Sequence, residues 1–274
     1  QMCIRDRIQA ATPGGVSFPH ITVVVEDDAE ASLVLDFRSG DGRMLVVPEI
    51  EVSVRDAARF RLATVQDVGR ATTVIGRQRM AVGRDATATF GEVGIGGDFA
   101  RLALEIDCFG QGSSAQVVGA YFGEEDQVLD YRYRVNHVGL NTTSDMFLKG
   151  AVEDRAQSVF TGMIHIEPGA QKTGAYQTNK NLVLSEGAQA QSVPNLEILA
   201  NDVKCSHGST MTPLDPEQRY YLMSRGLDER RADRLQVQGF FAEVLDRLPV
   251  DGIAGPLQER IIGKFVSAQE EGRV

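Results

Sequence analysis

The chain has 274 residues, of which 42% are hydrophobic, 7% aromatic and 24% charged. This composition is typical of a globular protein and excludes a disordered, collagen-like or coiled-coil chain. The 28 basic and 38 acidic residues leave a formal net charge of -10, which argues against general nucleic-acid binding because phosphates would be repelled. No run approaches the roughly 20 apolar residues of a membrane span. We therefore expect a protein that binds neither nucleic acid nor membrane.

Residues 1–12 show no periodic pattern and stay unassigned. Residues 1–7 are charged where a secretory signal would be apolar, so we expect a cytoplasmic protein. The three cysteines, Cys3, Cys108 and Cys205, are odd in number and widely spaced, which argues against a disulfide framework. Because residue 1 is Gln, we expect this chain to be a fragment of a longer protein.

Residues 13–210 are expected to form an all-β domain. Apolar and polar residues alternate in residues 101–106, so three apolar side chains fall on one face of a strand. Similar runs lie at 21–25, 32–37, 44–47, 50–54, 59–65, 128–135 and 159–166, with Gly-, Asp- and Asn-rich turns at 39–42, 94–98 and 109–114. Such a long β region without βαβ alternation exceeds an ordinary sandwich.

A weak repeat favours a solenoid. Gly169-Ala170-Gln171 recurs further along the chain as Gly187-Ala188-Gln189. A turn that returns at such a short, regular interval (about 18 to 22 residues) predicts coils that stack on one another. A left-handed hexapeptide solenoid would need an aliphatic residue every six positions, and residues 152–156 break that register. We predict a right-handed parallel β-helix, and a β-sandwich remains the alternative.

Residues 211–274 are expected to form a C-terminal α-helical domain. Asp215 as N-cap, Pro216 at the first helical position and Gln218 three residues after the cap predict the start of a helix. Gly226 suits its C-terminal end.

Two longer helices should follow. Asp228 is expected to cap the second, whose apolar stripe comprises Val237, Phe241, Val244, Leu245 and Leu248. A third helix is expected after Gly255-Pro256, with Leu257, Ile261 and Phe265 on one face. Such a module could cap the β domain or dock a partner.

Cys205 and His207 are the strongest candidates for chemistry. If residues 203–207 form a last strand, the two side chains point to the same face. A thiolate beside an imidazole can ligate iron or zinc, or form a Cys–His nucleophile pair. Two ligands do not complete a metal site, so another chain would have to supply the rest. The alternative is a small buried cysteine beside a solvent-facing histidine.

Other chemistry-bearing residues are expected to be structural. We predict that His165 is exposed and that Cys108 packs in the core. The glycines of residues 94–97 predict a turn, because no helix follows to make a nucleotide-binding loop. The acid pairs Asp126/Asp130 and Glu153/Asp154 are expected to be solvated turn residues.

Five ordered segments carry a family resemblance. They are residues 149–162, 177–185, 194–198, 202–210 and 221–226, within a match that runs from roughly 149 to 248. Together they resemble the SufB/SufD family of iron–sulfur cluster assembly scaffolds. The string Lys204-Cys205-Ser206-His207-Gly208 is similar to the SufD branch. Two features depart from the family: a largely missing N-terminal helical segment, and Met211-Thr212-Pro213 where a Val-Gly pair is usual.

The resemblance implies a right-handed parallel β-helix with a C-terminal helical domain, in a cytoplasmic SufBCD complex. The partners would be a SufB-like scaffold subunit and a SufC-like ABC-type ATPase. Cys205 and His207 would lie near the interface of the two β-helices and contribute to a nascent iron–sulfur cluster that this chain alone does not hold tightly. The expected ATPase-docking residues are Tyr221, Leu222, Arg225, Gly226, Phe240 and Phe241.

We therefore predict a non-catalytic scaffold subunit without catalytic residues. One alternative is a β-helix carbohydrate lyase or hydrolase, which would need clustered acids on one coil face. The other is a purely structural homodimeric solenoid without a metal role.

Overall fold

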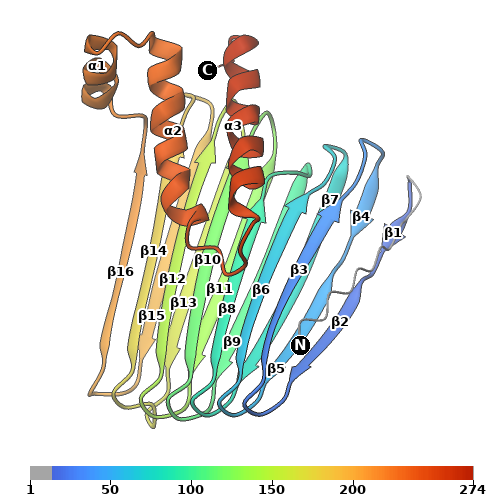
Figure 1. Cartoon of the computed structure of the whole chain (residues 1–274), viewed down its shortest axis with the longest axis vertical. Coiled ribbons are helices and arrows are strands. Elements are labelled where there is room, and N and C mark those ends of the chain that lie inside the picture. The colour runs from blue at the N-terminus through green and yellow to red at the C-terminus, as the bar shows by residue number, and fades with distance from the viewer. Residues whose placement is uncertain (1–13, 274) are drawn as a thin grey trace.

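The structure, a computed structural model, describes residues 14–273 and contains two parallel β-sheets and three helices (Figure 1). Successive strands alternate between the sheets over most of the chain. The nine-stranded sheet contains β1 (Val16–Ser17), β2 (His20–Val25), β4 (Met44–Val46), β5 (Glu49–Val54), β7 (Thr72–Val82), β9 (Phe99–Cys108), β11 (Val128–His137), β13 (Gln157–Ile166) and β15 (Gln189–Ile198). The seven-stranded sheet contains β3 (Glu30–Arg38), β6 (Arg59–Asp67), β8 (Thr87–Gly94), β10 (Ser114–Gly123), β12 (Thr143–Val152), β14 (Gly174–Val183) and β16 (Lys204–Thr212).

Each coil contributes β-strand structure to both sheets. Each strand pairs in parallel with the equivalent strand of the neighbouring coil. In this register Val128 pairs with Gln157 in one sheet, and Ser114 pairs with Thr143 in the other. Parallel pairing between strands of successive coils is the topology of a β-solenoid and not of an antiparallel sandwich. The predicted all-β body, a parallel β-helix followed by a C-terminal α-helical domain, is confirmed.

The predicted coil length is wrong, because the real coils are longer. Thr73 of β7 pairs with Phe99 of β9, and Gln157 of β13 pairs with Gln189 of β15, so both intervals exceed the one from Gly169 to Gly187. Gly169 lies in the turn between β13 and β14, whereas Gly187 lies in the next turn, between β14 and β15. The repeated Gly-Ala-Gln therefore marks the two opposite edges of one coil, and its spacing measures only part of a coil.

Turns at one edge of the solenoid repeat a left-handed backbone conformation. The non-glycine residues with positive φ in these turns are Asp28, Ala57, Asp85, Asn141 and Lys172. Carboxylates connect the stacked turns: an Asp56 oxygen accepts a hydrogen bond from the backbone N–H of Arg84 at 2.8 Å. This stacking of turns sets the coil length that the sequence repeat did not reveal.

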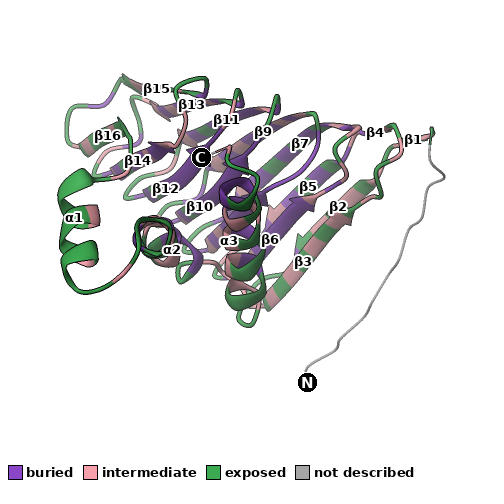
Figure 2. Cartoon of the chain, turned by 90° about the horizontal axis from the view of Figure 1, so that it is seen from above, coloured by how far each residue is buried: buried purple, intermediate pink, exposed green. Residues whose placement is uncertain are grey.

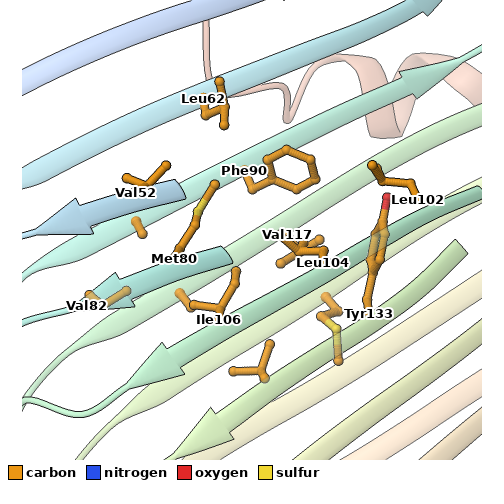
Figure 3. Close-up of a cluster of buried hydrophobic side chains, with 14 of the residues drawn as sticks. Val52, Leu62, Met80, Val82, Phe90, Leu102, Leu104, Ile106, Val117 and Tyr133 are labelled. Atoms are coloured by element: carbon orange, nitrogen blue, oxygen red, sulfur yellow. The ribbon is translucent and has the colours of Figure 1, made fainter. Parts of the chain in front are cut away.

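The first hydrophobic core fills the space between the two sheets. Side chains from both sheets meet there, as Figure 3 shows for Phe90 and Val117 opposite Leu104 and Tyr133. Period-2 alternation explains the arrangement, because every second residue of each strand points inward. These four residues are at most 2% exposed.

A second core lies between the outer face of the seven-stranded sheet and the helices α2 (Glu229–Leu245) and α3 (Ala254–Glu270). Figure 2 shows the helices on this side only, with the nine-stranded sheet on the far side of the solenoid. Phe122 from β10 packs against Phe241 from α2, with ring centres 6.3 Å apart. The seven-stranded sheet is thus covered on both faces over part of its length.

The helix boundaries follow the predicted caps closely. Asp215 accepts hydrogen bonds from two backbone N–H groups at the start of α1 (Pro216–Ser224), and Gly226 follows with φ 94°. Asp228 accepts from the N–H of Arg231 and caps α2. Strand β16 continues to Thr212, slightly past the predicted end of the β domain.

The predicted apolar stripes of α2 and α3 are buried, except that Leu248 lies just beyond the end of α2 and is partly buried. None of the helices in residues 14–273 has the length and apolar character needed to span a bilayer.

Candidate functional site

The candidate site lies at the C-terminal end of the solenoid, which is formed by β15 and β16. Strand β16 pairs only with β14, and β15 pairs only with β13, so among the described residues each has a paired neighbour on one side. Both strands are at the same end of the solenoid in Figures 1 and 2. Their outer edges present unpaired backbone N–H and C=O groups, which is a template for strands of another chain.

Cys205 and His207 are both on β16, two residues apart. Their pairing partners on β14 are Ala175 and Gln177, whose side chains are buried inside the solenoid. The alternation therefore directs Cys205 and His207 to the inner side of the sheet, on one face as predicted. The structure brings the two candidate ligands together on one edge strand.

The two side chains differ in depth. Cys205 is partly buried and packs against the first core, whereas His207 is exposed at the rim. Burial raises the pKa of the Cys205 thiol above its usual value, and a hydrogen bond with the Ala175 backbone opposes this effect. A thiol with a raised pKa is mostly protonated at neutral pH and is a poor nucleophile and metal ligand until its surroundings change.

Within residues 14–273, no three His, Cys, Asp or Glu side chains gather in a way that could hold a metal ion. Cys205 and His207 are a pair of soft and borderline donors on an open edge. Together they offer two ligands, fewer than a complete metal site needs.

Sequence reasoning missed the polar side chains next to this pair inside the solenoid. Gln177 is 2% exposed, and neither its amide nitrogen nor its amide oxygen has a hydrogen-bond partner among the described residues. Further along β14, Asn179 and Asn181 bond to the hydroxyl of Tyr121, which donates to the Asn181 carbonyl oxygen at 2.5 Å. The alternation of Gln177, Asn179 and Asn181 on one strand face was the signal that could have revealed this polar lining.

A second candidate surface lies around α1. Tyr221, Arg225 and Gly226 are exposed, and Leu222 and Phe240 line a cavity of about 480 Å³ between the helices and the end of β16. Of the six predicted ATPase-docking residues, Leu222 and Phe240 thus line one cavity, and three more are exposed on α1 or just after it. Phe241 is an exception, because it is completely buried against the sheet and can only support that surface from beneath.

Four of the residues expected at the surface are covered, and two of them are His165 and Asp130. His165 keeps only 12% of its side chain exposed, because Glu167 and Glu197 lie over its two ring nitrogens at 3.1 and 2.9 Å. Asp130 is buried beneath Arg101 and Arg132.

Glu153 and Asp154 are the other two. Asp154 pairs with Arg273 and keeps 12% of its side chain exposed. Glu153 is fully buried, and burial together with the adjacent Asp154 raises its pKa to about 8. Asp126, by contrast, is exposed and paired with Arg155 at 2.7 Å. Both acid pairs are thus occupied by cations or shielded, and neither is the free carboxylate pair that a carbohydrate-cleaving enzyme needs.

Two other residues are structural. Cys108 is completely buried, as predicted, and burial raises the pKa of its thiol to about 12. His137 is held between the hydroxyls of Thr142 and Ser144, both at 2.8 Å, and burial lowers its pKa to about 4. Its imidazole is therefore neutral at physiological pH.

Comparison with known proteins places this geometry among related chains. Residues 7–240 match the sequence model of a family described as SUF system FeS cluster assembly, SufBD core domain. The chain is 34% identical over 245 residues to an iron-sulfur cluster assembly SufBD family protein of Mycobacterium tuberculosis, an alignment that covers 86% of this chain and 61% of the relative.

Two relatives carry the name SufD. The iron-sulfur cluster assembly protein SufD of Bacillus subtilis is 30% identical over 240 residues, covering 86% of this chain and 55% of its own length. That of Escherichia coli is 28% identical over 236 residues, covering 86% and 56%. The chain thus spans a little more than half the length of these relatives.

Proposed function

The chain belongs to the SufBD core family of the SUF system for FeS cluster assembly, and from this membership we propose that it is a non-catalytic, cytoplasmic scaffold subunit for building iron–sulfur clusters. In this proposal the open end of its β-helix pairs with a SufB-like subunit. Its helical domain receives a SufC-like ABC-type ATPase, giving a SufBCD complex.

The observation that carries the proposal is the position of Cys205 and His207 on the terminal strand β16. A partner β-helix that extends the two sheets would pair with β15 and β16 and bring its own side chains opposite these two. Thiolate and imidazole ligands suit iron, and the partner would supply the ligands that this chain lacks. The nascent cluster is the cargo of such an interface and is not a resident cofactor of this chain.

The surface around α1 supports the ATPase part of the proposal. Tyr220 is 77% exposed and Tyr221 57% exposed, beside the half-exposed Met223 and Leu235. Tyrosine and methionine are enriched in protein–protein interfaces, whereas a free surface seldom gathers such large apolar side chains. The cavity next to them, lined in part by Leu222, provides a pocket for an anchoring side chain of the ATPase.

The raised pKa of Cys205 suggests how such a scaffold is controlled. While the thiol is covered by the core and the partner, it stays protonated and inert. ATP-driven dimerisation of the ATPases would strain the paired β-helices and open the interface. The thiol would then meet metal ions or cations that favour the thiolate.

A substitution experiment in the assembled complex tests the proposal. Cys205→Ala combined with His207→Ala should leave the complex intact, as judged by light scattering after size exclusion, and should abolish formation of the cluster absorption band during reconstitution. Ser206→Ala is the matched control, because Ser206 lies between them and faces the other side of β16. Unchanged cluster formation in the double variant would overturn the cluster-site proposal.

The same light-scattering measurement separates the alternatives. A discrete complex with a SufB-like subunit and the ABC-type ATPase is expected. A homodimer that ignores both partners would favour the purely structural solenoid.

A further inference from the structure

Lys149 is a buried cation in an apolar setting. It lies on β12, on the outer face that the helices cover, between Phe147 and Ala151 of the second core. Only 4% of the residue is exposed. A lysine is seldom buried without a partner, because an ammonium group loses much of its hydration energy there.

The hydrogen-bond and ion-pair partners of this lysine belong to α2, and the ring of Phe147, on its own strand, also lies 5.9 Å from its Nζ. Its Nζ donates to the backbone carbonyl oxygen of Phe240 at 2.8 Å and lies 2.6 Å from a carboxylate oxygen of Glu243. The same nitrogen lies 4.5 Å from the centre of the Phe240 ring, a cation–π distance. The hydrogen bond from Lys149 lowers the pKa of Glu243 and keeps that carboxylate ionised.

This contact differs in kind from the rest of the α2–sheet interface. The other contacts are mainly apolar side chains such as Val118, Phe122 and Phe241, whose burial is favourable but not directional. Charge-assisted hydrogen bonds have a defined geometry and resist sliding or rotation. Among residues 14–273, the pair Lys149–Glu243 is the only ion pair that joins α2 to the solenoid.

Lys149 also lies within a series of contacts that connects the two candidate surfaces. On one side, Arg219 of α1 is ion-paired with Asp233 of α2 at 2.6 Å, so the exposed tyrosines of α1 are attached to α2. On the other side, Lys149 of β12 pairs with Lys180 of β14, and Lys180 pairs with Thr210 of β16. Two steps across hydrogen-bonded strands therefore separate Lys149 from the strand that carries Cys205.

We propose that Lys149 is a positioning residue that transmits displacement of α1 and α2 to the sheet, and so couples ATPase docking to the exposure of Cys205. The inference rests on the proposed function, because it needs an ATPase on the helical domain and a gated thiol on β16. Apolar contacts are not directional, so a helix held only by them can repack over the sheet more easily than one held by a charge-assisted hydrogen bond. With the lysine bonded to a backbone carbonyl and a carboxylate of α2, the strand follows the helix.

The test compares Lys149→Met with Lys180→Met in the complex with the SufB-like subunit and the ATPase. Methionine keeps most of the length and apolar volume of lysine but loses the charge. Lys180 is the matched control, because it lies in register with Lys149 on the same face, one strand away. Its charge also helps to lower the pKa of Glu243, but among the described residues it forms no ion pair and donates no hydrogen bond to α2. Two quantities are measured: the affinity of the ATPase, and the rate at which a thiol reagent labels Cys205 with and without ATP.

The wild type and Lys180→Met should show faster labelling of Cys205 with ATP. In Lys149→Met the ATPase should bind with unchanged affinity, while the ratio of the two labelling rates falls to one. Glu243→Gln, which retains the size of the acceptor, should lower this ratio in the same direction and serves if Lys149→Met fails to fold. A ratio equal to that of the wild type in both variants would overturn the inference.

Loss of ATPase binding in both variants would also overturn the inference, since Lys149 would then shape the docking surface and not the transmission. Failure of the proposed function has a different signature: the wild type itself would bind no ATPase or show no effect of ATP on Cys205.

Discussion

Glu92 makes the stability of the solenoid depend on pH in a way that one substitution can isolate. Its side chain is buried on β8, where only 4% of the residue is exposed, and it accepts a hydrogen bond from the Thr64 hydroxyl. Burial raises the pKa of this carboxyl from 4.5 to about 8, and the hydrogen bond from Thr64 opposes only part of that effect. In the folded chain at neutral pH, Glu92 is therefore protonated.

The sign of the effect follows from the unfolded chain, where the same carboxyl ionises above pH 4.5. Its contribution to stability is fully present below pH 4.5 and is lost as the pH rises towards 8. A pKa difference of one corresponds to about 1.4 kcal/mol, so the whole loss is about 5 kcal/mol, of which about 3 kcal/mol falls between pH 5.5 and 8.5. Glu92→Gln is neutral at every pH and should not show this loss.

Thermal unfolding of the wild type and of Glu92→Gln at pH 5.5, 7.0 and 8.5 measures the effect. Between the two extremes, the wild type should lose about 3 kcal/mol relative to the variant, or about 6 to 12 °C in Tm. Glu153, whose pKa is also raised to about 8, contributes equally to both proteins and cancels in the comparison. Glu186→Gln, at an exposed position between β14 and β15, is the control and should behave as the wild type. The same pH dependence in wild type and Glu92→Gln would refute the reasoning.

Three further substitutions test the side-chain packing and one helix cap. A Cβ at position 150 would overlap the ring of Tyr121, so Gly150→Ala should cost about 1 to 3 kcal/mol in thermal unfolding, and a Tm equal to that of the wild type would contradict this close approach. Asp215→Ala removes the N-cap of α1; the helix should lose about 1 kcal/mol, seen as faster hydrogen exchange of its amides with unchanged exchange in β12. Phe241→Ala should cost about 3 to 5 kcal/mol, and a Tm within error of the wild type would contradict the existence of the second core.

Local signals predicted the elements well. Alternation predicted many of the strands, and Asp215, Gly226 and Asp228 marked the helix ends, because caps and alternation depend only on neighbouring residues. The same alternation placed Cys205 and His207 on one face. Coil length was not predictable in this way, since it depends on which distant turns stack.

Burial of charged residues was the main failure of sequence reasoning. Lys149 contacts Phe240 of α2, far along the chain, and no residue near Lys149 in the sequence indicates that α2 will cover it. Asp130 and Glu153 resemble surface acids for the same reason, because Arg101 and Arg273 reach them from other elements. The different depths of Cys205 and His207 also follow from tertiary structure, since β16 is the last strand of its sheet and has no coil beyond it among the described residues.

The unpaired edges of β15 and β16 have a consequence for how much of this chain a cell can tolerate. A subunit whose sheets end in open edges gains stability by mass action when a partner binds there. Copies made in excess of the partner therefore stay unbound and keep their strand edges exposed. Pro194, within β15, interrupts the donors of this edge, because it has no N–H to offer to any pairing strand. For the proposed pair, matched synthesis of the two scaffold chains is then a requirement set by the architecture of the solenoid end.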